Sequence, residues 1–386
     1  LVKEIDLTNI VPAVSTSIGA MAGNFSKGPV GVVTAISSEQ ELAANFGTPD
    51  SDNFETWFTA ANFLQYGNAL RVVRAEMAGM KNAAVGTAVL IKNDEDYEDN
   101  YFNNGSGSAS QGEWVAKSPG LEGNSLGVSV CASATGFEET ITTGAGEVSG
   151  TPAAGATTVN VSAGGGSAGA GGAKYNVGDI VHFQEADGTE YEITNITNDA
   201  LTIRQLDNPN GGGLKSALAD GTNVRRRWKF YDQVDAAPGT STFGASKNVT
   251  NDEVHVVVYD TTGLISGSKY GTAGGRTGSV LEIFSFVSQA SDARTAQGGT
   301  NYYVNVVNNG SQYVRWTDHD ASLTDAGEST TTAIANSSAT YASGTGKAGI
   351  ITSVLDGGVQ TTNSPAKPSV GELDTAYQFF ADSATV

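Results

Sequence analysis

The stretch FETWFTAANFLQYGNALRVVR, residues 54–74, determines the fold class that the sequence predicts. Its first part has apolar side chains at the spacing of an amphipathic helix, namely Phe54, Trp57, Phe58, Ala61 and Leu64. Asp52 and Glu55 form a predicted cap pair at the start of this helix, and Gly67 is expected to end it. Residues 70–74 then follow as a predicted strand. A helix, a glycine and a strand in this order indicate a layered α/β core.

The segment before this stretch predicts further parts of the same core. Residues 19–36 are expected to form a strand, a turn and then a second strand over residues 30–36. Ser38 and Glu41 have the spacing of a capping box, in which each side chain bonds the other residue's backbone. A short helix is therefore expected to run from this box to about Phe46.

Residues 1–18 predict an extended arm. Charged and polar residues interrupt its apolar positions, and Pro12 breaks the run. Because a segment with so few apolar residues cannot fold alone, the arm is expected to pair with a strand of its own subunit or of another. The residues expected to make these inter-subunit contacts are Leu1, Val2, Ile5, Leu7 and Ile10.

The rest of the chain predicts mostly strands, with helices in the minority. β-Branched runs favour strands at residues 125–131, 253–259, 280–287, 312–316 and 349–355. Residues 301–308 fit either a short helix or a strand, and we favour the helix. Ser369 and Glu372 form another capping box, followed by apolar residues at helical spacing, namely Leu373, Ala376, Tyr377 and Phe380.

Residues 140–228 differ in composition from their surroundings and contain Gly-Ala-Ser runs. Three strands are predicted there, separated by turns at Asp187-Gly188 and at Asn198-Asp199, over residues 177–183, 190–196 and 200–206. This pattern indicates a small antiparallel β unit, inserted within a larger insertion.

Composition excludes several classes of protein. The 386 residues carry a formal net charge of -20, which argues against a nucleic-acid binder because phosphate binding needs a basic surface. The one cysteine, Cys131, cannot form an internal disulfide and is expected to be a small buried hydrophobe. No apolar run of about 18 residues predicts a membrane span. The first residues do not resemble a signal peptide, and without an initiator Met the chain need not be a whole gene product.

The glycine-rich motifs do not predict a nucleotide or cofactor site. Gly164, Gly166 and Gly169 match the dinucleotide pattern, but no helix is expected after them. The segment from Gly344 to Lys347 resembles part of a phosphate loop. It lacks the first glycine of that motif and the Ser or Thr that follows its lysine.

The polar clusters also favour structural interpretations. The three histidines, His182, His255 and His319, are far apart in the sequence, and none lies in a ligand-spaced pair with Cys, His or Glu. The acidic run at residues 94–99 lacks the glycine of a calcium loop and indicates a solvated face. The basic cluster at residues 225–227 fits either contact with an acidic partner or neighbouring subunit, or a charged guard on a strand edge. No catalytic residue, metal ligand or cofactor-binding residue is therefore predicted.

Several segments resemble the contractile-tail sheath family of myovirus bacteriophages, which includes the T-even and cyanophage sheaths. The most specific are FGTP at 46–49 and AANFLQYGNALRVVRA at 60–75. Others are AGNF with KGP at 22–29, SPG with GNSL at 118–126, the segments at 282–293 and 301–303, and the helix at 376–382. Residues 140–228 and 320–346 match nothing in the family, whose members also continue beyond this chain.

The resemblance implies a mixed α/β sheath core with nested β-rich inserted domains and an extended N-terminal arm. It divides the chain into an arm at 1–18, a first core part at 19–82 and an inserted outer domain at 83–345, which contains the nested insertion at 140–228. Residues 346–386 would be a second core part, incomplete at its C-terminus.

In function, the resemblance implies a structural subunit of the virion. Such subunits form stacked six-membered rings around a tail tube, assemble in the host cytoplasm and contract to drive the tube through the host envelope. The expected partners are other copies of the chain, the tail tube protein, and the baseplate and tail terminator proteins, without nucleic acid or membrane insertion. No cofactor and no catalytic residue is implied.

Three other classes remain open at this point. A sheath of a bacterial contractile injection system would share the same core. A β-rich surface adhesin would also be acidic and rich in Gly, Ser and Thr. A cell-wall hydrolase would need a catalytic carboxylate, a Cys–His pair or a zinc set, and the sequence predicts none.

Overall fold

The computed structural model describes residues 18–102, 111–208, 211–267, 279–317 and 349–381. The chain forms two compact units. Unit 1 consists of residues 1–80, 92–94 and 360–386, and unit 2 of residues 81–91 and 95–359. Both contain helices and sheets, which confirms the mixed α/β class. The predicted arm residues Leu1, Val2, Ile5, Leu7 and Ile10 lie outside the described residues.

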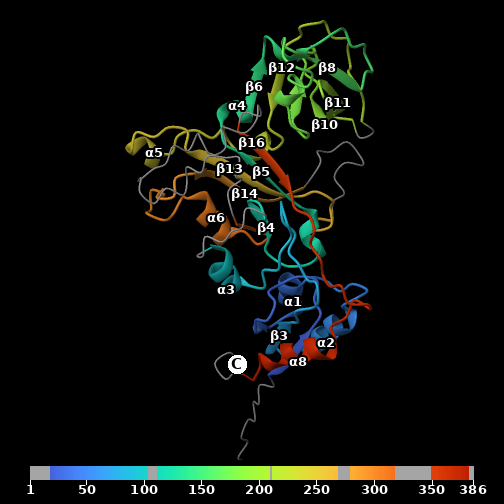
Figure 1. The fold of residues 1–386 in the computed structure, drawn as a ribbon, viewed down its shortest axis with the longest axis vertical. Helices are drawn as coiled ribbons and strands as arrows, with labels where there is room; N and C mark the ends of the chain where they lie inside the picture. Colours follow the sequence, from blue (N-terminus) through green and yellow to red (C-terminus); the bar gives the residue numbers. More distant parts are fainter. Residues whose placement is uncertain (1–17, 103–110, 209–210, 268–278, 318–348, 382–386) are drawn as a thin grey trace, which may run out of the picture. The chain divides into compact units, whose positions relative to one another are not determined.

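Unit 1 is a small sheet with helices on both faces (Figure 1). Its strands have the order β1-β3-β2; β1 runs parallel to β3 and β2 antiparallel to it. The bounds are β1 Gly19–Gly23, β2 Thr34–Ile36, α1 Glu39–Phe46, α2 Phe54–Leu64, β3 Leu70–Arg74 and α8 Val370–Gln378.

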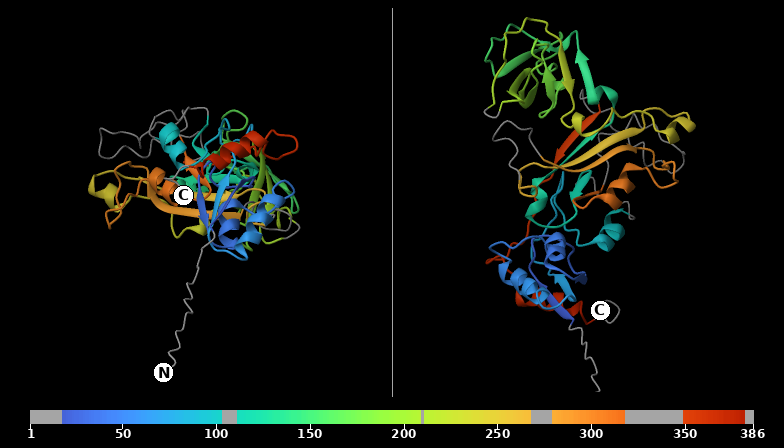
Figure 2. Two further views of the ribbon diagram at one scale, coloured as in Figure 1. Left: turned by 90° about the horizontal axis from the view of Figure 1, so that it is seen from below. Right: turned by 180° about the vertical axis from the view of Figure 1, so that it is seen from behind.

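Alternation along β3 supplies both faces of this sheet. Leu70 and Val72 are buried in one hydrophobic cluster with Trp57 of α2. Val73 is buried in a second cluster with Ala376 of α8. In Figure 2 the red helix α8 lies beside the blue strands, although about 300 residues separate them in the chain. Unit 1 is therefore closed by a segment that returns from the far end of the sequence.

The capping of α1 and α2 differs in part from the expectation. Ser38 caps α1 as predicted, but the Glu41 carboxylate accepts from the Ser37 N–H and hydroxyl, both at 2.8 Å, and not from Ser38. The predicted cap pair of Asp52 with Glu55 is wrong. Asp50 Oδ1 instead accepts the backbone N–H groups of Asp52 at 2.8 Å and Asn53 at 2.9 Å. These donors are bonded because Asp50 forms an Asx turn that begins two residues before Asp52.

Two other expectations for unit 1 are corrected. The strand predicted over residues 30–36 is reduced to β2, because Gly31 adopts a φ of 68° and interrupts the extended chain. The apolar stripe predicted for α2 is rotated. Its buried residues are Trp57, Ala60 and Ala61, while Phe54 and Phe58 are exposed.

Unit 2 is built on an antiparallel sheet with the order β14-β13-β5-β16. The strands are β5 Leu126–Cys131, β13 Glu253–Asp260, β14 Ser279–Ser288 and β16 Ile350–Val354. A two-stranded sheet pairs β4 Trp114–Ala116 with β15 Val314–Trp316, and α6 spans Tyr303–Gly310. The predicted strands and the helix favoured at residues 301–308 are thus confirmed. Residues 346–386 were expected to form one core part. In the structure they are divided, because β16 pairs with β5 in unit 2 while residues 360–386 belong to unit 1.

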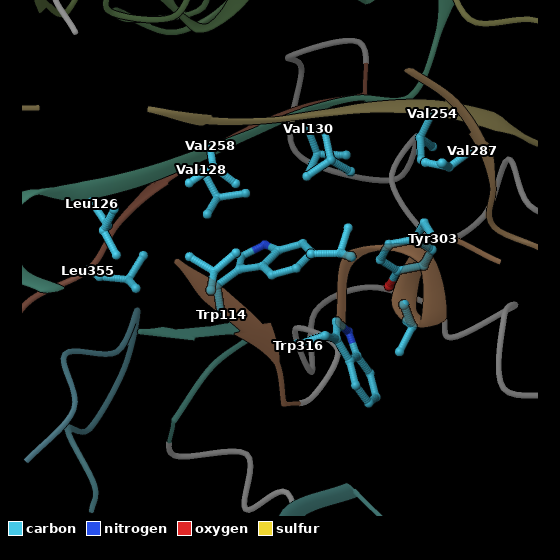
Figure 3. Packing of buried hydrophobic residues seen from close by; sticks show 14 of the residues in the cluster. Trp114, Leu126, Val128, Val130, Val254, Val258, Val287, Tyr303, Trp316 and Leu355 are labelled. Atoms are coloured by element: carbon cyan, nitrogen blue, oxygen red, sulfur yellow. The ribbon is translucent and has the colours of Figure 1, made fainter. Parts of the chain in front are cut away.

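The main core of unit 2 lies on one face of this sheet (Figure 3). Trp114 is fully buried beneath β5, the strand that carries Val128 and Val130, and the Tyr303 ring lies 6.4 Å from the Trp114 ring. The opposite face is also covered, by a cluster that includes Trp228. Every residue of β13 after Glu253 is therefore buried, which accounts for the four valines among its eight residues.

Residues 138–227, which we call the insertion barrel, contain a seven-stranded antiparallel sheet with the order β6-β12-β9-β10-β11-β8-β7 (Figure 1). Val148 exchanges backbone hydrogen bonds, each 2.9 Å, with Thr222 and Gly221 just before β12, so the sheet closes on itself. Its strands are β6 Glu138–Ile141, β7 Ala145–Val148, β8 Thr158–Ala163, β9 Ile180–His182, β10 Tyr191–Thr197, β11 Ala200–Gln205 and β12 Val224–Arg227. The antiparallel β unit predicted here is confirmed.

Short helices complete the connections: α3 Asp94–Tyr97, the π-helix Glu98–Phe102, α4 Ala134–Phe137 and α5 Thr242–Ser246, with 3-10 turns at Leu121–Ser125, Gly172–Lys174 and Tyr231–Gln233. None of the helices in the described part of the chain is long and apolar enough to cross a membrane.

Candidate assembly surface

A buried arginine lies at the centre of unit 1. Arg74, the last residue of β3, is fully buried. Its Nη1 donates to the Gly28 carbonyl at 2.8 Å, and its Nη2 donates to the Ser26 carbonyl at 3.3 Å and to Gln360 Oε1 at 3.0 Å. The planar guanidinium suits this task because it presents several donors in fixed directions.

Gln360 extends this network to the N-terminal segment. Its Nε2 donates to Asn24 Oδ1 at 2.9 Å and to the Phe25 carbonyl at 2.8 Å, and Asn24 Nδ2 donates to the Ala366 carbonyl at 3.3 Å. We call Arg74, Gln360 and Asn24 the polar clasp. It joins the turn after β1, the end of β3 and the returning segment before α8, which are far apart in sequence.

The FGTP motif has a packing explanation in the same unit. Phe46 is fully buried with its ring 4.8 Å from that of Phe25. Gly47 follows with a φ of 83°, and its carbonyl accepts a 2.8 Å hydrogen bond from Trp57 Nε1. Gly28 also has a positive φ, of 97°, and a Cβ there would lie 2.6 Å from the Asn45 carbonyl. These motif residues therefore fix the turns of the fold.

Unit 1 exposes an unusual share of large apolar side chains. Of the thirteen large hydrophobics exposed in the described residues, seven belong to this smaller unit. The α2 face consists of Phe54 and Phe58, one helical turn apart, with Tyr66 just beyond the helix at 93% exposure. The α8 face consists of Val370 and Tyr377, two helical turns apart, and Phe379 at the C-cap of the helix is also exposed. Exposed apolar groups that gather in this way are typical of surfaces that bind other proteins.

The basic cluster predicted at residues 225–227 pairs with acidic residues of its own unit. It lies on β12, an interior strand between β6 and β9, so it guards no strand edge. Arg225 forms a bidentate pair with Glu138, with both distances 2.9 Å. Arg226 is buried with Asp179 and Glu139, and Arg227 pairs with Glu190. The strand-edge interpretation is therefore wrong, and the three arginines form ion pairs with acidic residues of the barrel itself.

The remaining candidates also have structural environments. His255 is buried; its Nδ1 accepts the Phe286 N–H at 3.1 Å, and its Nε2 lies 2.9 Å from the Ala236 carbonyl. Burial lowers the pKa of His255, which favours the neutral ring. Cys131 is buried as predicted, and burial raises the pKa of its thiol to about 12. His319 lies outside the described residues.

The acidic and glycine-rich segments also have structural environments. The acidic residues from Asp94 to Asp99 lie at the surface around the buried Tyr97, as expected of a solvated face. In the Gly-rich tract, the backbone N–H groups of Gly169, Gly171 and Gly172 donate to the Asp199 carboxylate. Within the described ranges, no three His, Cys, Asp or Glu side chains gather as metal ligands would.

The clasp and the exposed faces were missed by the sequence analysis. An arginine at the end of a buried strand was the one local sign of the clasp. Nothing in the sequence near Arg74 points to Gln360, which is 286 positions away. For the α2 face, Phe54 and Phe58 fitted an inward stripe, and helical spacing alone does not separate a face that packs inside the unit from one that binds elsewhere.

Comparison with known proteins finds a similarity within this unit. Residues 16–75 match the family model described as the tail sheath protein Gp18 domain III N-terminal region. The chain is 42% identical over 72 residues to the tail sheath protein of Vibrio phage KVP40, and 41% identical over 73 residues to that of Enterobacteria phage T4. Each alignment covers 19% of this chain and 11% of the relative.

Unit 1 therefore contains a segment that is similar to a structural protein of bacteriophage tails. More particularly, residues 16–75 are similar to the N-terminal region of domain III of tail sheath proteins. The resemblance predicted from the sequence is therefore confirmed over this segment.

Proposed function

We propose that the chain is part of a structural subunit of a bacteriophage contractile tail sheath, and that unit 1 supplies its assembly surface. The observation that carries this proposal is the exposure of the α2 and α8 faces on the unit that contains the sheath-like segment. Two such faces on one small unit suit a subunit that contacts more than one neighbour, as a helical lattice requires. The chain is not proposed to be an enzyme.

In this proposal the subunits form stacked six-membered rings around a tail tube, in the virion, after assembly in the host cytoplasm. The tail tube protein, the baseplate and the tail terminator are the proposed partners besides other copies. Contraction would be a rigid-body rearrangement of subunits, with energy stored in the extended lattice. The interior of unit 1 supports this, because the polar clasp holds its segments together through buried hydrogen bonds.

The arrangement of domains is part of the same proposal. Unit 1 corresponds to the sheath core, and unit 2, with the insertion barrel nested in it, to the inserted outer domain. The arm at residues 1–18 would add as a strand to a neighbouring subunit. The position of the arm in the sequence supports this, since the arm directly precedes β1, an edge strand of the described sheet.

Electron microscopy of the purified gene product at high concentration tests the proposal. We expect hollow tubes of stacked rings, and we expect the Phe54→Ser, Phe58→Ser double variant to form none while remaining folded, because both side chains are already exposed. The matched control is Leu264→Ser with Ile283→Ser, which removes two exposed apolar side chains from unit 2 and is expected to leave tubes intact. Normal tubes from the α2 variant would contradict the assigned surface.

The arm is tested by deleting residues 1–17. The deleted protein should remain folded, with a thermal midpoint close to that of the parent, and should fail to form tubes because neighbouring subunits are no longer joined by an added strand. Negative-stain images and sedimentation of the polymer measure the result. Tubes of normal length and yield from the deleted protein would refute strand addition by this segment.

A further inference from the structure

Three Asp-Gly pairs occur in the sequence, at residues 187–188, 220–221 and 356–357. In such a pair the backbone nitrogen of the glycine can attack the carboxyl carbon of the aspartate, because glycine has no side chain to obstruct the approach. In a folded protein the rate depends on whether the backbone holds these two groups together. The structure therefore distinguishes the three pairs by the position of the glycine N–H.

The pair Asp356-Gly357 brings the two groups into contact. The Gly357 N–H donates to Oδ1 of Asp356 at 2.7 Å, so the nitrogen lies beside the carboxyl group that it would attack. Gly357 has a φ of 77°, and a Cβ at this position would lie 2.8 Å from the Cβ of Ala88, so the fold requires glycine here. Both residues of the pair are exposed, so water reaches the site.

The main chain on either side of this contact is fixed. Asp356 and Ala84 exchange two backbone hydrogen bonds, each 3.0 Å long. The Gly358 N–H donates to Asn124 Oδ1 at 2.7 Å, and Asn124 Nδ2 donates to the Gly358 carbonyl at 2.9 Å. The Gly357 peptide is therefore held between two anchors, and this restraint keeps its nitrogen near the carboxyl group.

The pair Asp187-Gly188 lacks this contact. The Gly188 N–H donates to the Glu185 carbonyl at 3.0 Å. The Asp187 carboxylate instead accepts the Thr189 N–H at 3.2 Å. The glycine nitrogen is therefore committed to another acceptor, and the carboxylate is directed past it to the next residue.

The pair Asp220-Gly221 is also held apart. The Gly221 N–H donates to the Val148 carbonyl at 2.9 Å, and the Asp220 carboxylate accepts the Gly150 N–H at 2.6 Å. The Asn-Gly pair at residues 309–310 ends α6, whose helical backbone directs each N–H toward the preceding turn. Of these pairs in the described part of the chain, only the one at residues 356–357 joins the glycine N–H to the side chain before it.

We propose that Asp356 is a site of spontaneous modification, at which the folded protein converts aspartate to isoaspartate through a cyclic succinimide. The Gly357 nitrogen forms a bond to Asp356 Cγ and loses its proton, while the neutral carboxyl group loses its hydroxyl, so that one water leaves. Water then adds to the ring. Addition at Cγ restores aspartate, and addition at the backbone carbonyl carbon of Asp356 leaves the main chain running through Cγ, which is isoaspartate. The water released in the first step is balanced by the water added in the second.

The product would lengthen the main chain by one carbon between the two anchors. The hydrogen bonds to Ala84 and to Asn124 were formed by the shorter chain, so the longer chain cannot keep both sets in their present geometry. The same segment continues to Val359, which pairs with Lys81, and then to Gln360 of the polar clasp. Modification is therefore expected to loosen the segment that leads to the clasp.

Peptide mapping of the whole protein tests the proposal. The protein is stored for several weeks well below its unfolding temperature at a pH of about 5, which favours the neutral carboxyl group that the reaction needs. Isoaspartate in each peptide is then measured by methyltransferase labelling and mass spectrometry. We expect several-fold more isoaspartate at residue 356 than at residues 187 or 220, and similar amounts at all three in urea, where the contacts are lost. Equal amounts in the folded protein, or less at residue 356 than at the others, would overturn the proposal.

Substitution of the aspartate gives a second test. Asp356→Glu keeps the exposed carboxylate but requires a six-membered ring, which closes more slowly, so we expect the label in this peptide to disappear while the thermal midpoint stays unchanged. The matched variants Asp187→Glu and Asp220→Glu should leave the label at residue 356 as in the parent. A label that persisted in the Asp356→Glu peptide would refute the assignment.

Amide hydrogen exchange measures the structural effect of the modification. After storage, exchange at Ala84 and Val359 should be several-fold faster in the modified fraction of the parent protein than in the Asp356→Glu variant, because the lengthened chain no longer fits both anchors. Equal exchange in the two proteins would contradict the expected loosening. Tube formation is not a readout in any of these experiments, so they remain interpretable whatever the outcome for the sheath proposal.

Discussion

Replacing Arg74 with alanine is expected to lower the free energy of unfolding of unit 1 by about 3 kcal/mol or more. The substitution leaves the carbonyls of Ser26 and Gly28 and the Gln360 amide oxygen without these donors, and each buried acceptor left unpaired costs about 1–3 kcal/mol. Water that enters the vacated space restores some of these bonds, so the lower end of the summed cost is the reasonable expectation. Urea denaturation followed by the fluorescence of Trp57, which is buried in the same unit, measures the change.

Arg71 provides the matched control for this prediction. It lies on the same strand and is only half-buried, so Arg71→Ala is expected to cost less than about 1 kcal/mol. Gln360→Ala should fall between the two, and the double variant should cost less than the sum, because both residues belong to one network. An Arg74→Ala protein as stable as Arg71→Ala would mean that the polar clasp does not hold unit 1 together.

Replacing Trp114 with alanine is expected to destabilise unit 2 by about 3–5 kcal/mol, the usual range for removing a buried aromatic side chain from a core. Trp114 is fully buried, lies under the central strands of the sheet and contacts Tyr303 of α6 (Figure 3). A hole of this size cannot be filled by small shifts of the surrounding valines. Calorimetric unfolding resolves the effect, as a lower midpoint for unit 2.

The control for Trp114 is Ile283→Ala on β14, an edge strand of the same sheet. Ile283 is exposed, so its truncation is expected to change stability by no more than about 0.5 kcal/mol. A Trp114→Ala protein that unfolded at the parent midpoint would show that α6 and the small sheet do not depend on this side chain for their contact with the main sheet.

Local patterns predicted the elements of this protein well. Strand β3 and helix α1 follow from alternation and from the Ser38 cap, and the last helix, α8, has the capping box of Ser369 with Glu372 that its sequence indicated. These signals lie within a few residues of the structure that they specify, which is why one sequence was enough to find them.

Features that depend on distant segments could not be predicted in the same way. The polar clasp needs Gln360 beside Arg74, and no spacing rule relates residues so far apart. Closure of the insertion barrel depends on peptide groups of Val148, Gly221 and Thr222, which leave no side-chain signal in the sequence. The exposed Phe58 is chemically indistinguishable from a core phenylalanine until the sheet that covers its helix is known.

The central claim is that unit 1, and not the insertion barrel, forms the lattice contacts of a tail sheath. Hydroxyl-radical footprinting of side chains, carried out on dispersed subunits and on assembled tubes, tests it most directly. The account predicts that oxidation of Phe58, Tyr66 and Tyr377 falls several-fold on assembly, while oxidation of Val177 in the barrel and of Leu264 elsewhere in unit 2 stays constant. Protection of the barrel residue, with Phe58 and Tyr377 as reactive as in the free subunit, would contradict it.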